Sequence, residues 1–139
     1  PQRILELDPP EMREQGLSYS KISYLHALAD AFHQGSLEPH ALKTMPEADI
    51  TASLTAVKGI GLWTAEMFMI FGMGRPDIWS PGDLGLRKAL WALFGEDADL
   101  TETSNDWAPY RSYASLYLWK FWDERPKTPK AAAQGTPTN

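Results

Sequence analysis

One aspartate, Asp83, stands where a carboxylate could do chemistry. It follows the stretch 72–82, which holds three glycines and two prolines, and it precedes an apolar segment with helical spacing. A side chain between a loop and a helix can project into a cleft, where a carboxylate can stabilise positive charge or activate water. The same position suits an ordinary helix N-cap that needs no chemistry. Position alone leaves both interpretations open.

A second candidate is the stretch Val57-Lys58-Gly59-Ile60-Gly61, which separates two apolar helical patterns. Two glycines around one aliphatic residue allow a tight turn with positive φ. Such a turn, with the N-terminus of the next helix, suits a phosphate oxygen, sometimes through a bound monovalent cation. Ile60 is predicted to point inward and join the two helices. The alternative is an αα-hairpin that binds no ligand.

The composition narrows the chemistry further. The 139 residues include no cysteine, which excludes disulfides, thiolate zinc sites and cysteine-ligated iron–sulfur clusters. The three histidines do not fall at metal-ligand spacing, so we expect no metal site and no required cofactor. The net charge of -5 argues mildly against a basic nucleic-acid surface. A phosphate held by backbone N–H groups and a cation needs no lysine cluster, however.

These residues must be positioned by helices. Apolar residues recur at three- and four-residue spacing and no segment alternates for long, which predicts an all-α fold. Helices are predicted over about 9–15, 20–34, 47–57, 62–71, 83–94 and 110–122, with short helical turns after Pro39 and before Trp107. The last helix is apolar nearly all the way round and is predicted to be buried on more than one side.

The predicted domain organisation is a single helical core, residues 1–122, with the helix-hairpin-helix at about 47–72. Residues 123–139 lack apolar anchors and are predicted to form a disordered tail. No apolar run approaches the roughly 20 residues needed to span a bilayer. The chain starts with neither a basic leader nor an apolar signal core. We therefore expect no membrane partner and a cytoplasmic location.

Three ordered segments carry a family resemblance. They are L-T-A-V-K-G-I-G-L-W-T-A-E-M-F (54–68), S-P-G-D-L-G-L-R-K-A (80–89) and W-A-P-Y-R-S-Y-A-S-L-Y-L-W (107–119). Together they resemble the helix-hairpin-helix DNA glycosylase superfamily, and within it DNA-3-methyladenine glycosylase II. The resemblance covers about residues 1–122. It implies a helical glycosylase bundle acting in base excision repair on the bacterial nucleoid.

The resemblance also implies roles for individual residues. Asp83 is the expected catalytic carboxylate, and bifunctional members carry a lysine at the position of Trp63, so its tryptophan implies a monofunctional enzyme. The expected base pocket comprises Trp63, Met67 and Trp119, and the expected phosphate site comprises Lys58, Gly59, Ile60 and Gly61. Arg111 belongs to a recurring segment in which a guanidinium could pair with a helix C-terminus or a carboxylate.

The implied reaction is hydrolysis of the N-glycosidic bond of alkylated bases in double-stranded DNA. Family members carry further N-terminal helices before the segment matched by residues 1–3, so we expect a further segment or a second chain to complete the fold. Three alternatives stay open: a non-catalytic helix-hairpin-helix DNA-binding module, a helical interaction protein, and a glycosylase for another lesion such as a mismatch or uracil.

Overall fold

The computed structural model describes residues 1–125, and within them every regular element is a helix. The elements are α1 (Gln2–Leu5), α2 (Pro9–Glu14), α3 (Tyr19–His33), α4 (Pro39–Thr44), α5 (Glu47–Thr55), α6 (Leu62–Met67), the π-helical turn η1 (Phe68–Gly72), α7 (Leu84–Phe94), α8 (Leu100–Asn105) and α9 (Arg111–Glu124). The all-α prediction is confirmed. Among these described helices, none has the length and apolar character to cross a bilayer.

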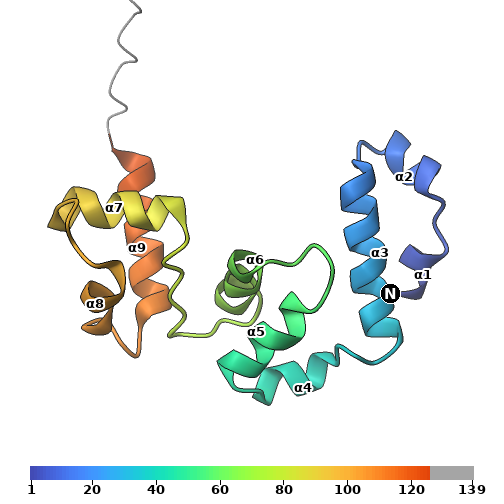
Figure 1. Ribbon diagram of the computed structural model, residues 1–139, viewed down its shortest axis with the longest axis horizontal. Helices are drawn as coiled ribbons and strands as arrows, with labels where there is room; N and C mark the ends of the chain where they lie inside the picture. Colours follow the sequence, from blue (N-terminus) through green and yellow to red (C-terminus); the bar gives the residue numbers. More distant parts are fainter. Residues whose placement is uncertain (126–139) are drawn as a thin grey trace, which may run out of the picture.

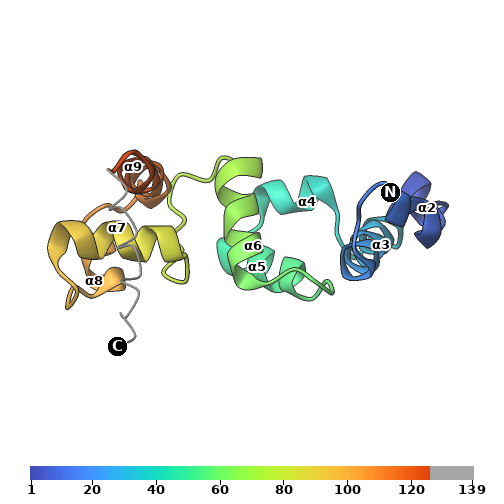
Figure 2. The same cartoon turned by 90° about the horizontal axis from the view of Figure 1, so that it is seen from above.

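The helices lie in three groups arranged in a row, α1–α3, α4–η1 and α7–α9 (Figure 1). The view from above shows the same succession (Figure 2). Two apolar clusters hold them together. The first core joins the end of α3 to α4, α5, α6 and η1, and comprises Ala31, Leu37, Leu42, Ile50, Leu54, Val57, Ala65, Met69, Ile70 and Ile78. The second core joins α7 to α9 and comprises Trp79, Leu86, Ala89, Leu90 and Leu118. The loop between η1 and α7 connects the two cores.

Local signals set most helix ends. The Ser18 side chain accepts a hydrogen bond from the Lys21 amide at 3.3 Å, which satisfies one of the free N–H groups at the start of α3. Asp99 does the same for α8, accepting from the Glu102 amide at 2.7 Å. Gly95, at φ 97°, ends α7. These short-range contacts explain why the helix predicted over 20–34 is displaced by only one residue at each end.

The helix predicted over 62–71 changes type at Phe68. The Met73 amide donates to the Phe68 carbonyl at 3.0 Å, an i to i+5 bond that widens the last turn. A side chain at Gly72 would place its Cβ 2.8 Å from the Phe68 ring, so the wide turn needs a glycine there. The Phe71 ring in this turn lies on the surface and stacks on Trp119, with ring centroids 5.7 Å apart.

The prediction that the last helix is buried on more than one side is wrong for residues 1–125. Its buried residues are Ser112, Ser115 and Leu118, whereas Tyr117 is 76% exposed. Small serine side chains let α9 approach the 76–78 loop and α7 closely on one face, whereas Tyr113 and Tyr117 are left exposed. The helix also continues to Glu124, two residues into the predicted tail; residues 126–139 lie outside the described part.

Candidate active site

Asp83 closes a four-residue turn and opens α7. Its amide donates to the Ser80 carbonyl at 3.0 Å, and its extended backbone (φ -70°, ψ 124°) makes it the N-cap. Carboxylate oxygen Oδ1 accepts from the Leu86 amide at 2.9 Å. The N-cap interpretation is therefore correct. It uses one oxygen of the carboxylate and leaves the other for contacts outside α7.

Two tryptophan side chains donate hydrogen bonds to the Asp83 carboxylate. The Trp119 indole Nε1–H, from α9, donates to Oδ1 at 2.9 Å. The Trp63 indole Nε1–H, from α6, donates to Oδ2 at 2.8 Å. Because α6 belongs to the middle group of helices and α9 to the last, Asp83 is one point at which side chains join the two groups.

These hydrogen bonds determine the charge of Asp83. Partial burial alone would raise its pKa, but the bonds from Trp119, the Leu86 amide, Trp63 and the Gly85 amide outweigh burial and hold the pKa below its usual value. The group is therefore ionised at neutral pH. A carboxylate can accept about four hydrogen bonds, and Oδ2 accepts only that of Trp63 within the described residues. Oδ2 is thus the oxygen with capacity for a cationic partner.

The three residues predicted to line a base pocket have different surroundings. Trp63 is 53% exposed, Trp119 is partly buried against both cores, and Met67 is partly buried against the first core. A hydrogen bond through Nε1–H uses only the edge of an indole, so the ring faces stay available. Phe71, which the sequence analysis did not single out, stacks on Trp119. The structure brings both tryptophans to Asp83, and base binding by the three residues stays a prediction.

The hairpin differs from its prediction in two details. Gly59 has the predicted positive φ, 92°, whereas Gly61 is extended at φ -91° and ψ 172° and serves as the N-cap of α6. The Ile60 amide donates to the Val57 carbonyl at 3.1 Å and is therefore engaged inside the turn. Its side chain packs against the first core, as predicted. The amides of Gly59 and Gly61 have no acceptor within residues 1–125 and Lys58 is exposed, and phosphate binding by these groups stays a prediction.

A contact that the sequence analysis missed explains why Gly59 must be a glycine. A Cβ at this position would lie 2.2 Å from the Tyr24 ring of α3. The ring therefore covers the turn from the side of α3, and both the backbone conformation and the available space require the absence of a side chain.

The hairpin and the Asp83 carboxylate both adjoin the start of α6. Gly61 caps α6, and Trp63, which binds Asp83, is the second residue of that helix. The predicted phosphate site and the predicted catalytic carboxylate are therefore connected through a single short helix. A carboxylate on the opposite side from the two-glycine turn would have excluded their joint action.

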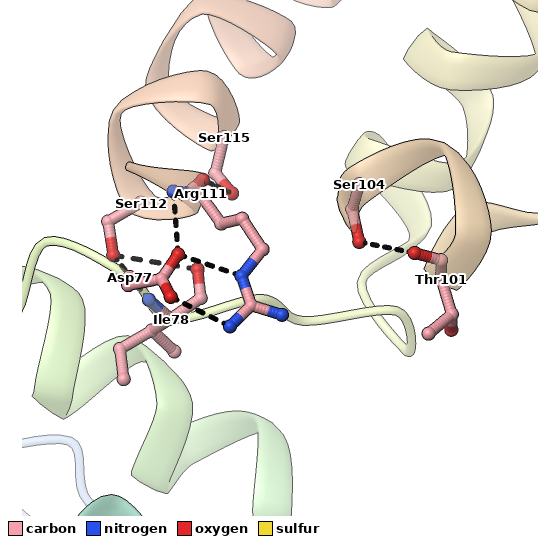
Figure 3. Close-up of polar contacts among 7 residues, drawn as sticks. All are labelled: Asp77, Ile78, Thr101, Ser104, Arg111, Ser112 and Ser115. Atoms are coloured by element: carbon pink, nitrogen blue, oxygen red, sulfur yellow. Dashed lines mark hydrogen bonds and ion pairs between the residues drawn. The ribbon is translucent and has the colours of Figure 1, made fainter. Parts of the chain in front are cut away.

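An ion pair fastens the loop between the two cores to the start of α9 (Figure 3). The Arg111 Nε donates to Asp77 Oδ1 at 2.7 Å, and a second guanidinium nitrogen donates to Oδ2 at 2.8 Å. The Ser112 hydroxyl accepts from the Ile78 amide at 2.9 Å. The carboxylate partner predicted for Arg111 is thus Asp77, whose pKa is lowered chiefly by the hydrogen bond from Arg111. These contacts have a structural role next to the site.

A buried carboxyl group, that of Glu66, contacts the turn that ends at Asp83. Glu66 of α6 is 7% exposed and its carboxyl accepts from the hydroxyl of Ser80, which is fully buried. Neither residue was singled out in the sequence, because a Glu at that spacing is equally compatible with a solvated helix face. Among residues 1–125, no three His, Asp or Glu side chains are grouped so as to hold a metal ion.

Comparisons with known proteins place this geometry in a family context. No family model matches the chain. A crystal structure of DNA-3-methyladenine glycosidase from Bacillus halodurans superposes with a TM-score of 0.82 at 35% identity, covering 88% of this chain and 59% of that one. The 3-methyladenine DNA glycosylase of Schizosaccharomyces pombe, solved with abasic DNA, gives a TM-score of 0.77 at 31% identity, covering 86% of this chain and 61% of that one.

A curated relative from another bacterium is similar in sequence over most of this chain. DNA-3-methyladenine glycosylase 2 of Escherichia coli is 29% identical over 122 residues, which is 86% of this chain and 41% of the relative. The chain spans about half the length of the curated relatives it matches. The sequence identity, the superposition of the helices and the position of the carboxylate beside the hairpin all indicate the same family. The chain belongs to the helix-hairpin-helix DNA glycosylase superfamily.

Proposed function

We propose that this chain carries the catalytic core of a monofunctional DNA glycosylase, which hydrolyses the N-glycosidic bond of alkylated bases in double-stranded DNA. The observation that carries the proposal is Asp83, an ionised carboxylate held on both oxygens by Trp63 and Trp119 next to the hairpin. The relatives named as 3-methyladenine glycosylases support the choice of substrate.

The hairpin is proposed to hold the DNA strand. The amides of Gly59 and Gly61 and the start of α6 offer N–H groups to a phosphate oxygen, and exposed Lys58 adds a positive charge. A monovalent cation is proposed to bind at the turn, with the free lone pair of the Val57 carbonyl as one candidate ligand. The cation would supply positive charge toward the phosphate, and no later step depends on it.

Base extrusion exposes the bond to be cleaved. Taking a nucleotide out of the duplex costs a few kcal/mol, and less for a poorly paired, damaged base. Alkylation at a ring nitrogen leaves the base positively charged, and an indole face attracts a cation by about 0.5–2 kcal/mol. Trp63, whose edge is bound to Asp83 while half of its surface is open, is the residue best placed for that contact.

Asp83 then acts on the sugar. As the glycosidic bond lengthens, the deoxyribose develops positive charge, and a fixed negative charge beside it lowers the barrier because no reorganisation is needed during the reaction. Four hydrogen bonds make the carboxylate a weak base, so charge stabilisation and orientation of water suit it better than proton abstraction. Trp63 offers no amine for a Schiff base, so strand cleavage by lyase chemistry is not part of the proposal.

The test compares Asp83→Asn with the unchanged protein in single-turnover release of free bases from methylated DNA. Asparagine retains the size and an oxygen acceptor for the N-cap, but it removes the charge and places an NH2 group opposite the Trp63 N–H. We therefore expect a folded protein of reduced stability, near-normal binding to DNA with an abasic analogue, and loss of base release. Unchanged release would remove Asp83 from the mechanism. DNA binding without any base release by the unchanged protein would favour a DNA-binding role without chemistry. Borohydride with abasic DNA should trap no adduct.

We also propose that the exposed apolar face of α9 is covered in the functional enzyme, by a further segment of the protein or by a second chain. Support comes from the exposed Tyr113, Leu116 and Tyr117 and from the length of the relatives. Base release by these 139 residues, compared with a longer version, tests the proposal. Equal release at equal concentration would contradict it.

A further inference from the structure

The turn that presents Asp83 is attached to α6 at both of its ends. At the last residue, Asp83 accepts the indole hydrogen bond of Trp63. At the first residue, the Ser80 hydroxyl donates to the carboxyl of Glu66. Trp63 and Glu66 are three residues apart on α6, so they lie on the same face of that helix. One helix face therefore holds both the beginning and the end of the turn.

A third contact joins the two ends of the turn, Ser80 and Asp83, to each other. The Asp83 amide donates to the Ser80 carbonyl at 3.0 Å, so a displacement of Ser80 is transmitted directly to the residue that carries the carboxylate. The Ser80 hydroxyl has no access to water, since the residue is 0% exposed and Glu66 is 7% exposed. Without the Glu66 carboxyl, the hydroxyl would be left buried without its partner, which is the costly case for a polar group.

The state of the Glu66 carboxyl fits this arrangement. Burial raises its pKa, the hydrogen bond from Ser80 opposes the shift, and the negative charges of Glu47 and Asp83 add to it. Glu66 is therefore harder to ionise than an exposed glutamate, and its carboxyl can accept the Ser80 hydrogen bond in either form. An apolar side chain at position 66 would fill the space but would not orient Ser80.

We propose that Glu66 is a positioning residue for the reaction: acting through the buried Ser80 hydroxyl, it sets the orientation of the turn and hence of the Asp83 carboxylate. Because Glu66 is 7% exposed, its proposed action passes through Ser80 and not through contact with the substrate. Its effect on the rate rests on the proposed glycosylase function, whereas its effect on the geometry of Asp83 does not.

The experiment uses three variants and one matched control. Ser80→Ala removes the donor, and Glu66→Met removes the acceptor at similar size. Glu66→Gln retains a side-chain carbonyl for Ser80. The control is Ser104→Ala, because Ser104 is also fully buried but its hydroxyl donates to the Thr101 carbonyl within α8, away from the site (Figure 3). Each protein is assayed for single-turnover base release, for binding to abasic-analogue DNA, and for the indole N–H resonances of Trp63 and Trp119 by NMR.

We expect Ser80→Ala and Glu66→Met to slow base release about 10- to 100-fold, as small displacements of a catalytic group do. Binding should be unchanged and the Trp63 resonance should move. Glu66→Gln should keep both the rate of base release and the Trp63 resonance close to those of the unchanged protein, and so should Ser104→Ala. If Glu66→Met does not fold, Ser80→Ala decides.

Two results would overturn the proposal. The first is an unaltered Trp63 resonance and unaltered release in Ser80→Ala. The second is an equal loss of release in Ser104→Ala, which would mean that general destabilisation is responsible. If neither this chain nor the longer version releases base, the proposed function fails, and the indole resonances alone still decide whether Glu66 positions Asp83.

Discussion

Replacing Trp63 or Trp119 by phenylalanine removes one hydrogen bond to Asp83 and retains a ring. A hydrogen bond to a charged group contributes about 1.5–3 kcal/mol, with the lower end applying where water can take its place. Trp63 is 53% exposed and Trp119 is partly buried against both cores. We therefore expect Trp63→Phe to lower the free energy of unfolding by about 1.5 kcal/mol and Trp119→Phe by about 2 kcal/mol at neutral pH.

The pH dependence separates this effect from lost packing. The pKa of Asp83 is depressed in the folded protein, so its contribution to stability is present above the unfolded value of 3.8 and is lost as the pH falls through the folded pKa. Each phenylalanine variant raises that folded pKa, and the hydrogen-bonded part of its destabilisation should therefore shrink in acid. Packing losses should not depend on pH in this way.

The assay is urea unfolding at a series of pH values from neutral to below 3.8, together with NMR titration of the Asp83 carboxyl carbon. Trp107→Phe is the control, because Trp107 packs on Trp79 and makes no hydrogen bond to Asp83. A destabilisation by Trp119→Phe that stays constant in acid, or an unchanged pKa of Asp83, would refute the two-indole description of the site.

Three further predictions concern the surroundings of the site. Gly59→Ala should destabilise the protein by more than the roughly 1–2 kcal/mol cost of a left-handed backbone; Gly16→Ala, with φ 88° and no atom within 4 Å, is the control in urea unfolding, and equal losses would contradict the Tyr24 contact. Arg111→Lys should cost about 1 kcal/mol, because the two-point contact with Asp77 is lost from a partly exposed pair; the loss should diminish in acid as Asp77, whose pKa is lowered, becomes protonated. Because the pKa of Glu66 is raised in the folded protein, its contribution to the free energy of unfolding is complete below pH 4.5 and is lost as the pH rises through the folded pKa. Glu66→Gln places an uncharged group near Ser80, Glu47 and Asp83 and should therefore become more stable relative to the unchanged protein as the pH rises. Parallel pH profiles of unfolding for the two proteins would show that Glu66 does not titrate in this range.

Much of the helical framework could be predicted because its signals are local. The caps at Ser18 and Asp83 and the glycine after Phe94 act within one helical turn, so reading a short window of residues is sufficient to find them. The hairpin was predictable for the same reason, except that Gly61 is extended and the Ile60 amide is engaged in the turn. The π-helical turn at Phe68 was not foreseen, because its wide bond has no strong local sequence signature.

The sequence by itself determined which residue types were available: one aspartate after a Gly/Pro loop, a two-glycine turn, and tryptophans in place of a lysine. Only the tertiary structure decided what they do together. The contacts of Asp83 with Trp63 and Trp119 join residues 20 and 36 positions apart, and those of Glu66 with Ser80 and of Tyr24 with Gly59 are equally non-local. Such pairs form only when helices pack in one particular arrangement, and the packing of two cores is a property of the whole chain that no short window of residues contains.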